Sequence, residues 1–411
     1  MNRALIVGAS VGGVKTAQAL RAAGHTGQIV IVEAEAVAHP YDRPPLSKGY
    51  LAPEAALAQI ALTTADELAA IDVQVRYGAA ATALDPTRKL VTLEDGEQLG
   101  YDSLVIATGA RARRSPWGEG PGMHVLRTSA DAEALRAELL PARRLLIVGA
   151  GFIGAEIAAT ATKAGVTVTM VDPLPAPMSR VLNDDVGQIF GDKHNTEGVD
   201  LILGHSVSSV ERADGGGFHV ALTDGTRLDV DAVLVGIGAV VNTEWLEGSG
   251  LVLDNGVLCT PGLAAVGVDD IYAVGDVCRW TDATRGETIR LEHWTNATDQ
   301  APIVAHNIVN PTAQRAYEAI EYVWSDQYDW KIQVVGRTGA TDHELIGAPE
   351  DGRFAVTYTA DGRKLTGAVI VNWPRALVTC RRAIADGTDI ASVRDSLARL
   401  AATSADARAR A

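Results

Sequence analysis

Two glycine-rich segments follow apolar, strand-like runs, and each could hold the phosphates of a nucleotide. The first, Gly8-Ala-Ser-Val-Gly-Gly13, follows Ala4–Val7, and the second, Gly149-Ala-Gly-Phe-Ile-Gly154, follows Leu145–Val148. A glycine turn between a strand and a helix lets a pyrophosphate approach the N–H groups at the helix N-terminus. Two such segments predict a protein that holds two dinucleotides. The expected phosphate contacts are Gly8, Ser10, Gly12 and Gly13 in the first segment, and Gly149, Gly151, Phe152, Ile153 and Gly154 in the second.

Ser10 stands where the middle glycine of such a segment is usual. That glycine normally lets the backbone come close to the pyrophosphate. A serine adds a small side chain, whose hydroxyl could still donate to a phosphate. The first segment is therefore less regular than the second, which has all three glycines.

Each segment is followed by an alanine-rich helix pattern and a second strand that ends in an acid. The first strand ends at Glu33, and Glu35 lies two residues on, so either carboxylate could reach a ribose. The second strand ends at Asp172, which could accept hydrogen bonds from the ribose hydroxyls of NAD. A carboxylate there would repel the 2′-phosphate of NADP, since like charges a few ångströms apart cost roughly a kcal/mol or more. Because residues 173–177 contain no arginine, we predict a preference for NADH.

The elements that must position these residues are those of an α/β protein. The chain has 411 residues, too many for one core, and its 41 glycines and 47% hydrophobic content suit closely packed strands and helices. A net charge of −15 argues against nucleic acid and anionic membranes as partners. The first predicted strand begins almost at the N-terminus, which leaves no room for a signal peptide, so we expect a cytoplasmic protein. Three widely spaced cysteines indicate neither a disulfide framework nor a metal site.

Five further segments, in order along the chain, carry a family resemblance. They read HPYDRPPLSK at 39–48, YDSLVIATGA at 101–110, IYAVGD at 271–276, RLEHW at 290–294 and WSDQ at 324–327. Together with the two glycine segments they resemble the flavin-dependent ferredoxin reductases that serve aromatic-ring dioxygenases and some cytochromes P450. Rubredoxin reductases share most of these segments. The resemblance covers roughly residues 2 to 395 and implies a glutathione-reductase-like fold with two Rossmann-like dinucleotide-binding domains and a smaller α/β C-terminal domain.

The resemblance also implies roles for individual residues. The first glycine segment would hold FAD and the second NADH, with Gly238 near the end of the NADH domain. Lys48 would lie beside the flavin ring near N5, with Glu156 as its partner acid. Asp276 would bind the ribityl chain, Ala81 and Arg127 would line the flavin site, and Trp294 would approach the pyrimidine end of the flavin. Lys48, Glu156 and Trp294 are accordingly the expected catalytic residues.

The absence of a cysteine beside the expected flavin site limits the reactions that the protein could catalyse. Disulfide reductases of this fold carry a cysteine pair beside the flavin, and related peroxidases keep one cysteine, whereas this chain has Pro44 and Pro45 in the corresponding segment. Electrons that reach the flavin would therefore leave singly to an external carrier, for which a [2Fe–2S] ferredoxin feeding an oxygenase is expected. Rubredoxin as carrier and an NADH oxidase remain alternatives. A more distant one is an NADH-sensing flavoprotein without rapid turnover, in the manner of apoptosis-inducing factor.

The order of the segments predicts three domains. Residues 1–112 and 248–322 would form a discontinuous FAD domain, residues 113–247 an inserted NADH domain, and residues 323–411 the C-terminal domain. We expect a monomer or a homodimer. Docking of an acidic carrier would need local positive charge, for which the candidates are Arg111, Arg113, Arg114, Arg315, Lys331 and Arg337.

Overall fold

The computed structural model describes residues 2–409, with side chains up to residue 402; the outermost ends of the predicted domains, residues 1, 410 and 411, lie outside the described residues. The chain forms two compact units. Unit 1 combines Met1–Pro44, Ala56–Arg111 and Ala239–Ala319, and unit 2 combines Pro45–Ala55, Ala112–Gly238 and Ile320–Ala411. The predicted α/β class is confirmed, while the division into three domains stays a prediction.

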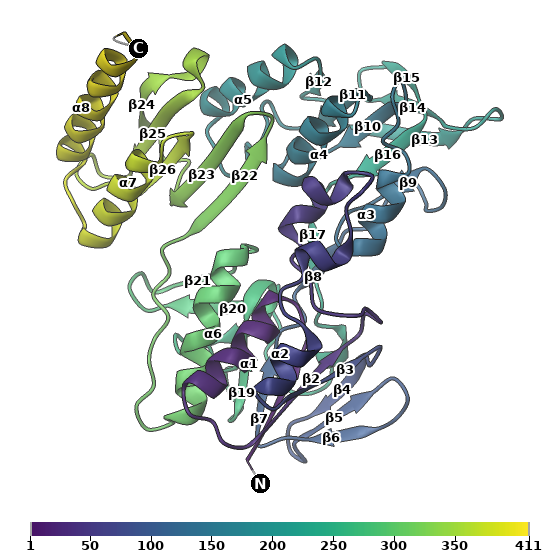
Figure 1. Ribbon diagram of the computed structural model, residues 1–411, viewed down its shortest axis with the longest axis vertical. Coiled ribbons are helices and arrows are strands. Elements are labelled where there is room, and N and C mark those ends of the chain that lie inside the picture. The colour runs from purple at the N-terminus through teal and green to yellow at the C-terminus, as the bar shows by residue number, and fades with distance from the viewer. Residues whose placement is uncertain (1, 410–411) are drawn as a thin grey trace. The chain divides into compact units, whose positions relative to one another are not determined.

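Unit 1 is built on a five-stranded parallel sheet in the order β19-β7-β1-β2-β3 (Figure 1). Its strands are β1 (Arg3–Val7), β2 (Gln28–Glu33), β3 (Val73–Tyr77), β7 (Ser103–Ile106) and β19 (Ile271–Ala273). The central strands are almost continuously apolar, as parallel strands buried on both faces require. Helix α1 (Val11–Ala22) follows β1 directly and packs against α6 (Trp294–Val309).

Two small sheets and one short helix complete unit 1. One sheet is antiparallel, in the order β4-β5-β6, and the other has the order β18-β20-β21. The bounds of these elements are β4 (Ala81–Asp85), β5 (Leu90–Leu93), β6 (Gln98–Gly100), β18 (Val257–Cys259), β20 (Cys278–Asp282), β21 (Glu287–Ile289) and α2 (Ala65–Ala70). The strands β8 (Ala110–Ala112) and β17 (Ala239–Val241) lie near the points where the sequence leaves and re-enters this unit.

Unit 2 contains a second parallel sheet, in the order β12-β11-β10-β16-β9. Its strands are β9 (Met123–His124), β10 (Arg144–Val148), β11 (Thr167–Asp172), β12 (Asp200–Leu203) and β16 (Ala232–Val235). The helices of this part are α3 (Ser129–Arg136), α4 (Phe152–Lys163) and α5 (Asp184–Thr196). A three-stranded antiparallel sheet joins it, formed by β13 (Val207–Arg212), β14 (Phe218–Leu222) and β15 (Arg227–Val230).

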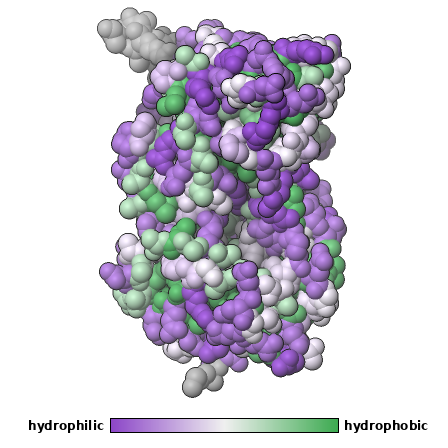
Figure 2. All heavy atoms as spheres, turned by 90° about the vertical axis from the view of Figure 1, so that its right-hand side faces the viewer, coloured by the Kyte–Doolittle hydropathy of each residue, from purple (hydrophilic) through white to green (hydrophobic). Residues whose placement is uncertain are grey.

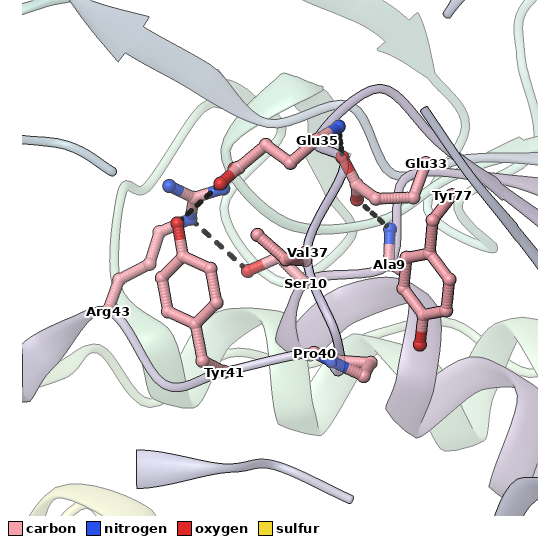
Figure 3. A pocket seen from close by; sticks show the side chains of 9 residues that line it. All are labelled: Ala9, Ser10, Glu33, Glu35, Val37, Pro40, Tyr41, Arg43 and Tyr77. Atoms are coloured by element: carbon pink, nitrogen blue, oxygen red, sulfur yellow. Dashed lines mark hydrogen bonds and ion pairs between the residues drawn. The ribbon is translucent and has the colours of Figure 1, made fainter. Parts of the chain in front are cut away.

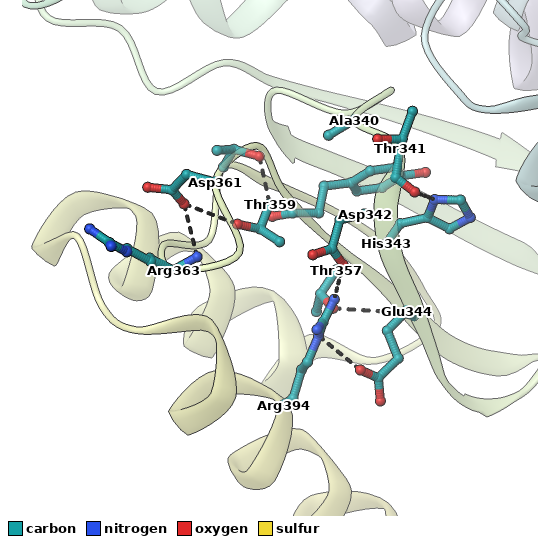
Figure 4. A network of polar contacts seen from close by, with 12 residues as sticks. Ala340, Thr341, Asp342, His343, Glu344, Thr357, Thr359, Asp361, Arg363 and Arg394 are labelled. Atoms are coloured by element: carbon teal, nitrogen blue, oxygen red, sulfur yellow. Dashed lines mark hydrogen bonds and ion pairs between the residues drawn. The ribbon is translucent and has the colours of Figure 1, made fainter.

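The rest of unit 2 is an antiparallel sheet in the order β22-β23-β26-β25-β24, followed by two helices (Figure 1). The elements are β22 (Tyr322–Gln327), β23 (Trp330–Gly336), β24 (Asp342–Ala348), β25 (Arg353–Thr359), β26 (Gly367–Val371), α7 (Pro374–Asp386) and α8 (Ile390–Ala409). Arg394 of α8 binds the edge strand β24 through ion pairs with Asp342 and Glu344 (Figure 4). An aromatic cluster of Phe190, Trp330 and Phe354 packs α5 against this sheet.

Hydrophilic residues cover most of the face shown in Figure 2, and hydrophobic residues are interspersed among them. Within the described part of the chain, no helix is both long enough and apolar enough to cross a membrane.

Candidate functional site

The first glycine segment lies at the carboxyl edge of the unit 1 sheet, where the parallel strands end and the loops after them begin. Gly8 has a φ of +109°, and a Cβ atom there would collide with the carbonyl oxygen of Ala107, which follows β7. A Cβ at Gly13 would collide with the carbonyl oxygen of Gly8. These two positions accept only glycine, because the first makes the tight turn and the third lets the helix pack closely on the strand.

Ser10 occupies the middle position without strain. Its φ of −77° and ψ of −171° are extended backbone angles that any residue can adopt, and it is the N-cap residue of α1. The first N–H groups of a helix have no partner within the helix and are available to an anion. The serine therefore leaves the phosphate cradle of the segment intact.

The two acids that could not be separated by sequence have different surroundings (Figure 3). The Glu33 carboxylate accepts hydrogen bonds from the backbone N–H of Ala9, at 2.6 Å, and of Glu35, at 2.9 Å. The Glu35 carboxylate instead pairs with Arg43 at 2.7 Å and accepts a hydrogen bond from the Tyr41 hydroxyl at 2.6 Å. Glu33 is thus bound to the backbone of the glycine segment itself, whereas Glu35 is bound by the Tyr41 and Arg43 side chains of the neighbouring proline-rich segment.

A second turn borders the same sheet edge. Gly275 and Asp276 follow β19, and the Gly275 N–H donates to the buried Gln300 side chain of α6 at 2.7 Å. A Cβ at Gly12 would lie 3.2 Å from Cγ1 of Val274, so the glycine segment and this turn are in close contact. The turn that carries Asp276 therefore starts beside the first glycine segment, within one unit.

Trp294, the first residue of α6, is held by an aspartate that sequence reasoning did not single out. Its indole N–H donates to the Asp42 carboxylate at 2.7 Å. Burial raises the pKa of Asp42, and the hydrogen bond from Trp294 opposes that shift. No local pattern reveals this pair, since its members lie 252 positions apart.

The second glycine segment repeats the first at the carboxyl edge of the parallel sheet in unit 2. Gly149 has a φ of +110°, and a Cβ there would collide with the carbonyl oxygen of Gly236, which follows β16. A Cβ at Gly154 would collide with the carbonyl oxygen of Gly149. At Gly151 an added Cβ would meet no atom within 4 Å, so the space in front of this residue is open.

The acid of the second segment is fixed in the same way as Glu33. The Asp172 carboxylate accepts hydrogen bonds from the backbone N–H of Ala150 at 2.7 Å and of Leu174 at 2.8 Å. Gly238, after β16, has a φ of +103° and lies within reach of the Arg180 guanidinium, which would be 3.8 Å from an added Cβ. Both glycine segments therefore fit a dinucleotide: each offers a glycine turn, a helix N-terminus and an acid fixed at the sheet edge.

The predicted partners Lys48 and Glu156 are brought together in unit 2. The Lys48 ammonium group lies 2.7 Å from Oε2 of Glu156, a residue of α4 that is only 3% exposed. Oε2 also accepts a short hydrogen bond from the Ser47 hydroxyl, and Oε1 accepts one from the Ser325 hydroxyl at 2.7 Å. A buried carboxylate with three donors, one of them charged, is a satisfied group and not an isolated charge.

The remaining predicted residues are less informative in position. Ala81 begins β4 and is half-buried. The backbone N–H of Arg127 donates to Asp131 at the start of α3. The WSDQ segment begins with Trp324, which stacks on Tyr322.

Several candidate docking arginines already pair with acids. Arg111 pairs with Glu244, and Arg114 pairs with Glu119. Arg337 is bound to Glu321. These three ion pairs offset part of the local positive charge, and the docking patch stays a prediction.

The three cysteines are buried and unpaired by disulfides. Burial, together with the neighbouring Cys259, raises the pKa of the Cys278 thiol. Burial also raises the pKa of Cys380 to about 12. Because the thiolate is the reactive form, Cys278 and Cys380 are poorly suited to exchange with a disulfide.

Residues 2–301 match the pyridine nucleotide-disulphide oxidoreductases, and residues 322–407 match the reductase C-terminal family. The chain belongs to the pyridine nucleotide-disulphide oxidoreductase family. As a member of this family it is an oxidoreductase with FAD and NAD(P)H as cofactors, which confirms the predicted pair of dinucleotides.

Similar proteins within this family are ferredoxin reductases, as the resemblance predicted. The chain is 38% identical to a ferredoxin–NAD(P)+ reductase of a Sphingomonas species, covering 87% of each chain. It is 36% identical to the ferredoxin–NAD+ reductase component of the anthranilate 1,2-dioxygenase system of Burkholderia cepacia, covering 93% of this chain and 94% of that one. It also resembles the reductase in the crystal structure of a covalent putidaredoxin reductase–putidaredoxin complex. That likeness has a TM-score of 0.89 at 35% identity, and it covers 94% and 93% of the two chains.

Proposed function

We propose that the protein takes a hydride from NADH and passes the electrons singly to a [2Fe–2S] ferredoxin that feeds an oxygenase. The observation that carries this proposal is the pair of matching glycine segments, each with an acid fixed at the edge of its sheet. FAD, when bound, supplies the chemistry that converts a two-electron donor into a source of single electrons. The chain itself binds and orients the two dinucleotides and tunes the flavin.

FAD is assigned to the first segment, with Gly8, Ser10, Gly12 and Gly13 at its pyrophosphate. We assign its ribose to Glu33, because this carboxylate is bound to the glycine segment, while Glu35 is engaged by Arg43 and Tyr41. The adjacent turn supports Asp276 as a further contact. The family resemblance alone supports the same assignment for Lys48, Ala81, Arg127 and Trp294.

NADH is assigned to the second segment. Gly149, Gly151, Phe152, Ile153 and Gly154 would receive its pyrophosphate, with Asp172 at the ribose and Gly238 nearby. The open space in front of Gly151 supports the close approach of a phosphate. The fixed carboxylate of Asp172 supports NADH over NADPH, since a 2′-phosphate would meet a negative charge.

The electrons need an acceptor outside the chain. All three cysteines are buried, and raised pKa values keep Cys278 and Cys380 as thiols. Among the described residues, these buried thiols do not support a disulfide relay of the kind for which the family is named. The reductases named above act with ferredoxins, and one of them belongs to a dioxygenase system, which supports the same class of partner here.

Finer points belong to the same proposal. We place the protein in the cytoplasm, as a monomer or a homodimer, with the three domains predicted from the segment order. Rubredoxin reduction, NADH oxidation and NADH sensing are not favoured by any feature of the structure.

Stopped-flow mixing of the FAD-loaded protein with NADH and a panel of carriers tests the function. We expect rapid bleaching of the flavin, followed by cytochrome c reduction that depends on an added [2Fe–2S] ferredoxin. Rapid oxygen consumption that no carrier accelerates would favour an oxidase. A reduced flavin that is long-lived with every carrier would favour an NADH sensor. Faster electron transfer to rubredoxin than to ferredoxin would identify rubredoxin as the carrier.

A further inference from the structure

Two residues of β22 complete the environment of Glu156. Ser325 and Gln327 are 0% and 2% exposed, and both come from the WSDQ segment. The Ser325 hydroxyl lies 2.7 Å from Oε1 of Glu156, and Nε2 of Gln327 lies 3.1 Å from that hydroxyl. Nothing in the proposed reaction yet uses either side chain.

The direction of this hydrogen-bond chain is fixed. An amide nitrogen only donates, so the Ser325 oxygen accepts from Gln327 and its own proton is left for Glu156. Nε2 of Gln327 also donates to the sulfur of Met178 at 3.8 Å, so the amide has a second acceptor. Inside a buried region, donors aligned in this way strengthen one another.

The two oxygens of Glu156 are held from opposite elements. Oε2 receives Lys48 and Ser47, while Oε1 receives Ser325. A carboxylate is planar, so its rotation is fixed only when both oxygens are bound. Lys48 has a flexible four-carbon stem, and the position of its ammonium group therefore depends on a carboxylate that cannot turn.

We propose that Ser325, oriented by Gln327, is a positioning residue that sets the place of the Lys48 ammonium group through Glu156. The inference rests on the proposed function, in which Lys48 lies beside the flavin. It gives the WSDQ segment a role in flavin tuning in addition to its place in the C-terminal sheet.

The test is a measurement of the flavin midpoint potential in the FAD-loaded protein. Ser325→Ala removes the donor to Oε1, and we expect the reduced flavin to be stabilised about tenfold less, a shift of about 30 mV to more negative potential for a two-electron couple. Ser325→Thr keeps the hydroxyl and is expected to restore the potential.

A double-mutant cycle separates positioning from general damage. If Ser325 acts through Lys48, Ser325→Ala will not shift the potential further in a Lys48→Met protein. The matched control is Thr359→Val, which removes another buried hydroxyl of the same sheet; it bonds Asp361 and not this network (Figure 4). This control should leave the potential unchanged.

The outcomes are distinguishable. If Lys48→Met does not move the potential, the proposed place of Lys48 beside the flavin is wrong, and the inference falls with it. If Lys48→Met moves the potential and Ser325→Ala does not, the inference alone is overturned. It is overturned in the same way if the effects of the two substitutions are additive, or if Thr359→Val shifts the potential equally.

Discussion

The two glycine segments have nearly the same backbone but different occupants at the middle position. Gly8 and Gly149 have φ values of +109° and +110°. Ser10 and Gly151 likewise match, with φ and ψ of −77° and −171° against −75° and −177°. In both segments the acid is bound to the backbone N–H of the residue after the first glycine.

This comparison separates two reasons for glycine in such a segment: the backbone conformation of the turn and the close approach of the ligand. The first and third positions need glycine because any Cβ would strike the backbone. The middle position has ordinary angles, so glycine there serves only the approach of the ligand. A serine is compatible with the segment assigned to a resident cofactor, while open space is kept in the segment assigned to a substrate that enters and leaves.

The largest effect should come from the first glycine of each segment. Gly8→Ala combines a positive φ with a backbone collision, and we expect FAD binding to weaken on the order of 100-fold or the unit not to fold. Gly149→Ala should weaken NADH binding as strongly while the protein remains yellow. Flavin absorbance and NADH titration measure the two losses, and a Gly149→Ala protein that loses its FAD would contradict the assignment.

A smaller effect should follow at the acid of the second segment. We expect kcat/KM for NADH to exceed that for NADPH by roughly tenfold or more, because Asp172 opposes a 2′-phosphate. Asp172→Ser should lower the value for NADH and bring the two substrates closer together. Equal values for the unsubstituted protein would contradict the argument.

His194 should give unit 2 a loss of stability in acid. Burial lowers the pKa of this residue to about 4, and its Nδ1 lies 2.7 Å from the Tyr328 hydroxyl. The unfolded chain binds the proton more tightly, so stability falls as pH decreases from about 6.5 towards 4, by about 1.4 kcal/mol per unit. We expect His194→Gln to be less stable than the parent at pH 7.5 and to approach it at pH 5. A constant difference in thermal unfolding would count against this account.

Asp42 should give the stability of unit 1 the opposite pH dependence. Burial raises its pKa, so the folded state binds the proton more tightly and this contribution to stability is lost as pH rises above about 3.8. Asp42→Asn keeps an acceptor for Trp294 and should raise the Tm at pH 7 by roughly 1–2 °C. The increase in Tm should vanish near pH 4. An increase that does not depend on pH would show that the buried charge of Asp42 is not its cause.

The smallest effects should come from exchanging the middle residues. Gly151→Ser and Ser10→Gly both keep allowed backbone angles, so each should change the free energy of unfolding by less than about 0.5 kcal/mol. We expect Gly151→Ser to raise the KM for NADH several-fold and Ser10→Gly to leave FAD binding unchanged. Calorimetry and steady-state kinetics check both, and a strongly destabilised Gly151→Ser protein would show that the two backbones are not equivalent.

Much of the fold could be predicted because its signals are local. The strands before both glycine segments, the helices α1 and α4 after them, and the acids at the ends of β2 and β11 follow from apolar runs and the turn residues between them. Strand β24 carries no such signal, because its sequence, DHELIGA, is largely polar and half-exposed at a sheet edge. The sequence alone could not separate Glu33 from Glu35, because both alternate to the same face.

The residues that hold the predicted site residues in place could not be predicted from the sequence. Ser325 reaches Glu156 across 169 positions, and Asp42 reaches Trp294 across 252. Single serines and aspartates carry no periodic signal, and their partners are set by how distant segments pack. Recognition of the family supplied Lys48 and Glu156, but not the residues that hold them.

The strand order of unit 1 has a consequence for synthesis on the ribosome. Strands β1, β2, β3 and β7 are complete by residue 106, but the edge partner of β7 is β19, which begins at Ile271. At about 5–20 residues per second, the 164 intervening residues (107–270) take about 10–30 s to emerge. During that time the hydrogen-bonding edge of β7 has no native neighbour, and an unpaired apolar strand edge invites association with other chains. Because β19 joins at the outside of the sheet, it can dock late without threading, and the nascent chain needs protection mainly along this one edge.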